Sequence, residues 1–169
     1  MGSDQRSQGI DKERDEEGKI ISSTYIREML ADGNIIKANK LLGYYYFVTG
    51  TVQHGNAIGH TKLYPTANLI PPAVKHLPKF GVYVTRVTVD GKTYGGLTNV
   101  GAKPTISGEN PVGVETYLYN FEGDLYGKDM KVELLDFVRP EMKFESIDAL
   151  KAQLDHDIKE CQRRYLEFA

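Results

Sequence analysis

Five strand-like segments follow one another after residue 43 with no helix-like segment between them. Each is rich in β-branched and aromatic residues, and they span 44–52, 81–89, 93–100, 112–121 and 130–138. The pair Asp90-Gly91, which separates two of them, is typical of a tight hairpin turn. Strands in succession without intervening helices predict an antiparallel sheet or barrel and argue against a doubly wound fold.

The chain before these strands divides into two parts. Residues 1–19 are almost without apolar side chains, so they cannot offset their ordering entropy by burial, and they predict a disordered leader. Residues 20–43 predict a helical hairpin, with hydroxyl groups at 22–24 to cap the first helix and a glycine after each helix. The main domain is expected to comprise residues 44–169.

The last predicted element is a helix that begins after the N-cap Ser146. Its apolar residues recur at steps of three or four and form one stripe, made of Ile147, Leu150, Leu154, Ile158, Cys161 and Tyr165. We expect this stripe to pack against the sheet, its cysteine included, because a free cysteine usually behaves as a small hydrophobic residue.

The length and composition of the chain limit the cellular compartment and the binding partners that we expect for the protein. A chain of 169 residues can bury one hydrophobic core. Its single cysteine cannot form an internal disulfide, which suits a reducing compartment, and it has no apolar run near the ~20 residues of a membrane span. The net charge of −2 gives no support to a nucleic-acid or basic membrane-surface protein. We therefore expect a cytoplasmic monomer that binds neither nucleic acid nor membrane.

Three segments are candidates for chemistry. The first is a turn after the first strand that contains His54, Gly55, Gly59 and His60. Its glycines would let backbone N–H groups approach a ligand closely, although an ordinary hairpin connection has the same composition.

The second candidate is the pair Thr66 and Asn68, which follows Pro65. In an extended chain, residues two apart project to the same side. A hydroxyl and an amide oxygen so placed could share a hard cation such as Mg²⁺. A turn in which the Thr and Asn side chains bond to the local backbone remains the alternative.

The third candidate is Glu115, which lies within a strongly β-prone segment, where Glu is uncommon. Strand alternation places it on the same face as Tyr117 and Tyr119. Beside a ligand, its carboxylate could take a proton from an attacking hydroxyl. A solvated strand glutamate is the alternative.

Seven short segments form a set of motifs whose order and spacing extend over most of the chain. They comprise residues 54–55, 65–68, 81–83, 99–105, 114–115, 123–127 and 139–144. From Tyr46 onward the chain resembles the riboflavin kinase module at the C-terminus of bacterial bifunctional riboflavin kinase/FAD synthetases.

The resemblance implies a fold and an activity. The fold is a mainly β, six-stranded antiparallel Greek-key barrel with a C-terminal helix. The activity is transfer of the γ-phosphoryl group of ATP to the ribityl 5′-hydroxyl of riboflavin, which gives FMN, with Mg²⁺ or Mn²⁺ as the metal. Glu115 would be the general base, and Thr66 and Asn68 would bind the metal and the ATP phosphates. The ATP site would also include His54, Gly55, Gly59, His60 and Asn99, and the flavin site would be bordered by Arg139, Glu141 and Phe144.

Residues 21–27 resemble the final motif of the adenylyltransferase module that precedes the kinase in the bifunctional enzymes. The chain has no H-x-G-H motif, so we expect no FAD synthetase activity. Two alternatives remain: a fragment of a bifunctional enzyme, and a non-catalytic flavin- or nucleotide-binding barrel. The sequence departs from the family at Ile58, His60 and Leu63, which puts the affinity for ATP in question.

Overall fold

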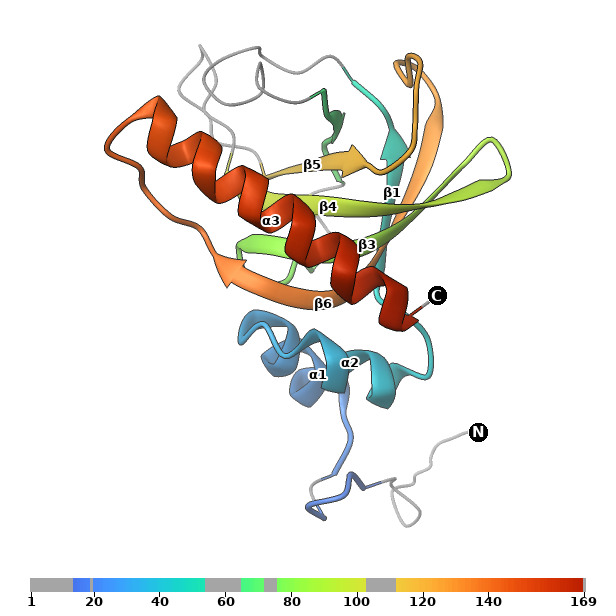
Figure 1. Ribbon diagram of the computed structural model, residues 1–169. Helices are drawn as coiled ribbons and strands as arrows, with labels where there is room; N and C mark the ends of the chain where they lie inside the picture. The colour runs from blue at the N-terminus through green and yellow to red at the C-terminus, as the bar shows by residue number, and fades with distance from the viewer. Residues whose placement is uncertain (1–13, 19, 54–64, 72–75, 103–111, 169) are drawn as a thin grey trace.

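The computed structural model describes residues 14–18, 20–53, 65–71, 76–102 and 112–168. In this part of the chain, six antiparallel strands form a nearly closed barrel with three helices around it (Figure 1). The strands are β1 (Phe47–Thr51), β2 (Ala67–Leu69), β3 (Gly81–Val89), β4 (Lys92–Ala102), β5 (Val112–Leu118) and β6 (Asp129–Pro140). The helices are α1 (Ser23–Ala31), α2 (Ile35–Leu42) and α3 (Ile147–Phe168).

The strands hydrogen-bond in the order β1-β6-β3-β4-β5-β2, so the first strand pairs with the last. The sheet then curls back on itself, because the N–H of Gln53, just after β1, donates to the carbonyl oxygen of Asn68 in β2 at 2.8 Å. The predicted six-stranded antiparallel barrel with a C-terminal helix is confirmed.

The hairpin between β3 and β4 has the predicted turn. Asp90 and Gly91 have φ values of +53° and +74°, the left-handed pair that a type I′ turn requires. A non-glycine side chain at Gly91 would strain that conformation, whereas Asp tolerates it at Asp90. The strand β3 has the bounds predicted from its residue pattern.

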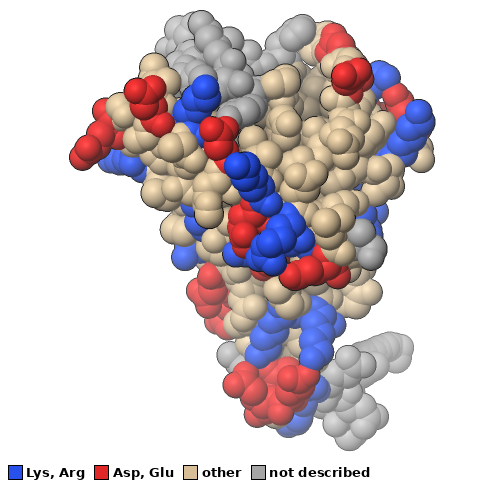
Figure 2. Space-filling model, in the orientation of Figure 1, with Lys and Arg blue, Asp and Glu red and all other residues tan. Residues whose placement is uncertain are grey.

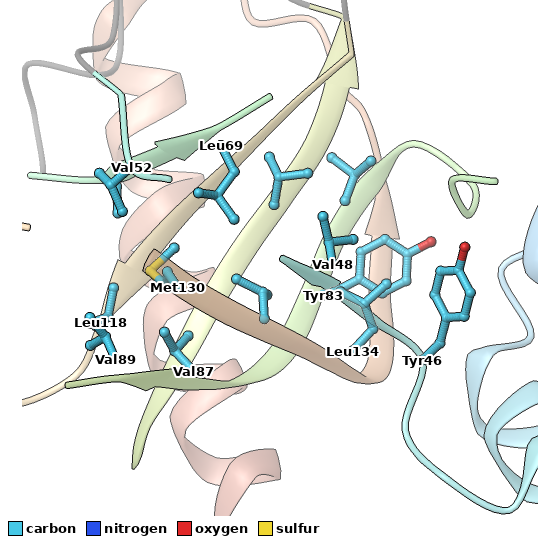
Figure 3. Packing of buried hydrophobic residues seen from close by; sticks show 14 of the residues in the cluster. Tyr46, Val48, Val52, Leu69, Tyr83, Val87, Val89, Leu118, Met130 and Leu134 are labelled. Atoms are coloured by element: carbon cyan, nitrogen blue, oxygen red, sulfur yellow. The ribbon is translucent and has the colours of Figure 1, made fainter. Parts of the chain in front are cut away.

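The interior of the barrel is filled by apolar side chains that point toward one another from several strands (Figure 3). They include Val48, Leu69, Val87, Met130 and Leu134, and all five are nearly or fully buried. The helical hairpin extends this core with the buried residues Leu30, Ile35 and Ala38.

The buried amide of Asn39 joins the hairpin to the barrel. Its nitrogen donates to the carbonyl oxygen of Leu134 at 2.8 Å, and its oxygen accepts from the N–H of Tyr46 at 2.7 Å. Residues 14–18, within the predicted disordered leader, also contact the hairpin: the Tyr25 hydroxyl donates to Asp15, and Lys37 pairs with Asp15 at 3.2 Å. Residues 1–13 and 19 lie outside the described part, and the disordered leader expected over residues 1–19 stays a prediction.

The long helix α3 crosses the outer face of β3 and β4 (Figure 1). A second apolar cluster forms there, in which Cys161 packs with Val82, Leu97 and Leu135. Burial raises the pKa of the Cys161 thiol to about 12, which keeps it protonated and unreactive. The cysteine therefore packs as predicted.

The first half of the α3 stripe differs from the prediction. Ile147 is 71 % exposed, and Leu150 and Leu154 line a cavity. Ile158 lines the same cavity and also packs against the outer cluster. The helical period correctly identified one face of α3, but it could not distinguish a face that meets the sheet from a face that borders a cavity.

On the face that Figure 2 shows, basic and acidic side chains of the described residues lie among one another. Among the described residues, no helix is both long enough and apolar enough to cross a membrane.

Three threonine hydroxyls form a chain inside the barrel, and they provide a test of its stability. Thr98 Oγ1 lies 2.9 Å from Thr85 Oγ1 and 2.8 Å from Thr116 Oγ1, and all three residues are fully buried. Thr98→Val should lower the free energy of unfolding by about 2 kcal/mol, because two buried hydroxyls lose a partner. Urea denaturation measures this, with the exposed Thr93→Val as control. Equal stability of the two variants would contradict the prediction.

Candidate active site

A row of register partners crosses the sheet from β2 to β6. Asn68 pairs with Glu115, Glu115 with Asn99, Asn99 with Val82, and Val82 with Arg139. Directly opposed residues of antiparallel strands share a face of the sheet. This is the outer face, because Val82 packs in the cluster with α3. Segments far apart in the sequence thus bring the predicted residues Asn68, Glu115, Asn99 and Arg139 into one line.

Glu115 lies next to Thr66 at the edge of the barrel. The hydroxyl of Thr66 donates to Oε2 of Glu115 at 3.3 Å, and both side chains are half-buried. Tyr117 and Tyr119 lie on the same face as Glu115 and pack in the outer cluster, as alternation predicted. The Glu115 carboxylate therefore stays outside the hydrophobic interior.

A cavity of about 180 Å³ lies between this face of the sheet, the segment 141–144 and the first half of α3. Its walls are largely apolar. The predicted site residues that line it are Thr66, Asn99, Glu115, Arg139, Glu141 and Phe144. Residues predicted from four separate segments thus border one space.

Thr66 also borders a second cavity, of about 660 Å³. It is bordered by Gln53, by residues 65–68 and by residues 116–118 and 120–126. Thr66 and Tyr117 line both cavities. The two cavities are therefore adjacent at Thr66, whose hydroxyl donates to the Glu115 carboxylate.

The guanidinium of Arg139 is bound on α3 by a residue that the sequence analysis missed. Its Nε and Nη2 donate to the Asp157 carboxylate at 2.9 and 2.7 Å, and the Asp157 side chain is fully buried. An available signal was a charged residue on the apolar side of α3, between Leu154 and Cys161.

The structure places the other predicted residues as follows. Asn68 borders the second cavity, whereas Asn99, predicted for the ATP site, borders the first cavity together with the predicted flavin residues. His54, Gly55, Gly59 and His60, with the departures at Ile58 and Leu63, lie outside the described residues.

A metal here would need oxygen ligands of the Thr and Asn type. Within the described ranges, no three His, Cys, Asp or Glu side chains gather in a way that could hold a metal ion. Thr66 and Asn68, with one hydroxyl and one amide oxygen, both border the second cavity. Hard oxygen donors beside an open space fit the preference of Mg²⁺, which usually retains water and substrate phosphate oxygens as further ligands.

A model of the riboflavin kinase (Flavokinase) family matches residues 42–165. The chain belongs to the riboflavin kinase family. It is 37 % identical over 148 residues to the bifunctional riboflavin kinase/FMN adenylyltransferase of Listeria monocytogenes, covering 88 % of this chain and 47 % of the relative. It is 40 % identical over 143 residues to the enzyme of that name from Escherichia coli K12, covering 84 % and 45 %. The chain thus spans about half the length of these curated relatives.

A solved structure shares the fold. A crystal structure described as a macrolide-efflux protein from Streptococcus pneumoniae superimposes with a TM-score of 0.79 at 40 % identity. The superposition covers 89 % of this chain and 49 % of that one. As a riboflavin kinase family member, the chain has the six-stranded barrel that the resemblance implied.

Gly101 on β4 leaves room for the carboxylate of Glu141, which lines the first cavity, and this provides a second test. A Cβ at Gly101 would lie 2.1 Å from Oε1 of Glu141, so Gly101→Ala must displace that carboxylate. The fold should tolerate this, because the displaced atom is the end of a flexible side chain. For the riboflavin kinase activity proposed below, we expect the KM for riboflavin to rise roughly three- to tenfold, the size of one lost hydrogen bond.

Steady-state kinetics of Gly101→Ala, of Glu141→Ala and of the double variant measure this effect. If Gly101 acts by making room for Glu141, the double variant should be no worse than Glu141→Ala alone. An unchanged KM in Gly101→Ala, or fully additive losses, would contradict this role.

Proposed function

We propose that this chain is a riboflavin kinase, which transfers the γ-phosphoryl group of ATP to the ribityl 5′-hydroxyl of riboflavin and gives FMN and ADP. One observation carries the proposal: Thr66 lines both cavities and donates a hydrogen bond to Glu115, so a candidate base lies where two substrates would meet. Membership of the riboflavin kinase family supplies the reaction class.

In this proposal Glu115 is the general base. Its carboxylate accepts the proton of the 5′-hydroxyl as that oxygen bonds to the γ-phosphorus, and the bond from the γ-phosphorus to the leaving ADP oxygen breaks. Such a base contributes ~10²–10⁴-fold to the rate. Phosphoryl transfer otherwise requires that the two substrates be held in line and that the phosphate charge be neutralised.

The two cavities would divide the substrates. Riboflavin would occupy the first cavity, whose apolar walls suit a flat aromatic ring and whose border includes Arg139, Glu141 and Phe144. The phosphates of ATP would lie in the second cavity against Thr66 and Asn68. Mg²⁺ or Mn²⁺ held there would neutralise negative charge on the phosphate oxygens. The roles proposed for His54, Gly55, Gly59, His60 and Asn99 at the ATP stay predictions.

Analysis of the reaction products tests the proposal. The chain is incubated with riboflavin, ATP and Mg²⁺, and the flavins are separated by chromatography, with a control that lacks ATP. FMN alone is the expected product. FAD would show that adenylyl transfer also occurs, against our prediction from the missing H-x-G-H motif. No product at all would favour a non-catalytic flavin- or nucleotide-binding barrel and would overturn the proposal.

We further propose that residues 44–169 form the kinase domain and that the hairpin of residues 20–43 supports it structurally. The support is the shared core, in which Ile35 and Ala38 pack with the barrel. A monomer, a cytoplasmic location and the lack of a nucleic-acid partner stay predictions.

A further inference from the structure

A buried ion pair joins α3 to the wall of the first cavity. Asp157 lies on α3 with its side chain fully buried, and Arg139 lies at the end of β6 with 15 % of its side chain exposed. Arg139 donates to the carboxylate from Nε at 2.9 Å and from Nη2 at 2.7 Å. From α3 itself, Gln153 donates to Oδ1 of Asp157 at 2.9 Å. The Asp157 carboxylate is thus held from both elements.

Stability alone is a weak explanation for this pair. Removing a carboxylate and a guanidinium from water costs several kcal/mol per ion, and apolar residues of similar volume often stabilise a fold as well or better. The neighbouring α3 residues Leu154, Ile158 and Cys161 are apolar. What an ion pair adds, and apolar packing does not, is a fixed orientation of the planar guanidinium.

That orientation matters because Arg139 borders the cavity. Its Nη1 donates to the carbonyl oxygen of Pro140 at 3.0 Å, and its guanidinium carbon lies 5.9 Å from the centre of the Phe144 ring. Arg139 also ends the cross-sheet row that contains Glu115. A displaced Arg139 would therefore change the cavity wall opposite the candidate base.

We propose that Asp157 is a positioning residue for the flavin substrate. It holds the guanidinium of Arg139 in the orientation in which Arg139 and Phe144 together form a wall of the riboflavin cavity. Asp157 does not itself border the cavity and acts through Arg139. This inference rests on the proposed riboflavin kinase function.

The test compares Asp157→Asn with Asp136→Asn. Asp136 lies on β6 and accepts from Nη1 of Arg164 on α3 at 3.1 Å, so it ties the same helix to the same strand but away from the cavity lining. The dissociation constant of riboflavin is measured by flavin fluorescence and the KM values by steady-state kinetics, well below the melting temperature of each variant.

Asp157→Asn should raise the riboflavin Kd and KM about tenfold, the size of one coupled contact, with less than a twofold change in the KM for ATP. Asp136→Asn should leave the riboflavin Kd within about twofold. In an Arg139→Met background, adding Asp157→Asn should cause no further loss of riboflavin affinity, because the effect passes through Arg139.

If Asp157→Asn does not fold, Gln153→Met is tested instead. This substitution removes one hydrogen-bond donor to the Asp157 carboxylate, and methionine has about the same length as glutamine. A riboflavin Kd unchanged in every folded variant overturns the inference. So does an equal loss in Asp157→Asn and Asp136→Asn, which would make Asp157 a general anchor of α3. Failure of the unmodified protein to form FMN would instead overturn the proposed function.

Discussion

Replacing Glu115 with Gln is expected to lower the rate of FMN formation ~10²–10⁴-fold, the usual contribution of a general base. The amide keeps the shape of the side chain, and it can still accept a hydrogen bond from Thr66, 3.3 Å away in the native protein. It cannot accept the proton of the ribityl hydroxyl. We therefore expect kcat to fall while the riboflavin Kd stays within about threefold, since uniform binding is retained.

The matched control is Glu167→Gln, which removes an exposed carboxylate near the end of α3 whose pairing with Arg163 contributes little to stability. That variant should retain the activity of the unmodified protein. Rapid-quench measurement of the chemical step separates catalysis from product release. Near-normal turnover in Glu115→Gln would remove Glu115 from the role of base and would leave the junction of the cavities without a proton acceptor among the predicted residues.

Thr66→Val has the second-largest expected effect, a fall in kcat/KM of about 100-fold, because a small misplacement of reacting groups is costly. Valine has the shape of threonine but lacks the hydroxyl that donates to Glu115 and that would bind the metal. Both the orientation of the base and the binding of the phosphates would suffer. We expect a higher KM for Mg-ATP, a lower kcat and a nearly unchanged riboflavin Kd.

Thr93→Val is the control for this substitution, because Thr93 is an exposed threonine on β4 that lines neither cavity. Steady-state kinetics with varied ATP and with varied riboflavin distinguish the effects on the two substrates. If Thr66→Val retained kcat/KM within about threefold, the hydroxyl at the junction would have no part in the reaction, and the metal ligation proposed for Thr66 would be refuted.

The elements that the sequence predicted well are those whose signal is local. The strand β3 is rich in β-branched residues over its nine positions, and Asp90-Gly91 marks its turn, so its bounds follow from neighbouring residues alone. The strand β2 has only three residues. No pattern can identify so short a strand, because its pairing with β5 and with Gln53 is decided by contacts distant in the sequence.

The sequence likewise predicted residues of the candidate site but not the contacts between them. Thr66 and Glu115 stood out by residue type and spacing, and the resemblance to a known family supplied their roles. Their contact depends on how β2 and β5 pair, which residue spacing does not reveal. The prediction for α3 failed in part for the same reason. A helical period identifies an apolar face, but Leu150 and Leu154 meet a cavity because the segment 141–144 and β6 leave a space there.

The residue pattern by itself predicted an antiparallel sheet or barrel with a C-terminal helix, and the resemblance to the riboflavin kinase family implied the six-stranded barrel. The strand and turn predictions rest on β-branched and aromatic composition and on turn residues, which are properties of residues close together in the chain. Only the tertiary structure decided that two cavities meet at Thr66 and that Asp157 binds Arg139. Both depend on the register of neighbouring strands and on where α3 crosses the sheet, and this register is set by the packing of the whole core.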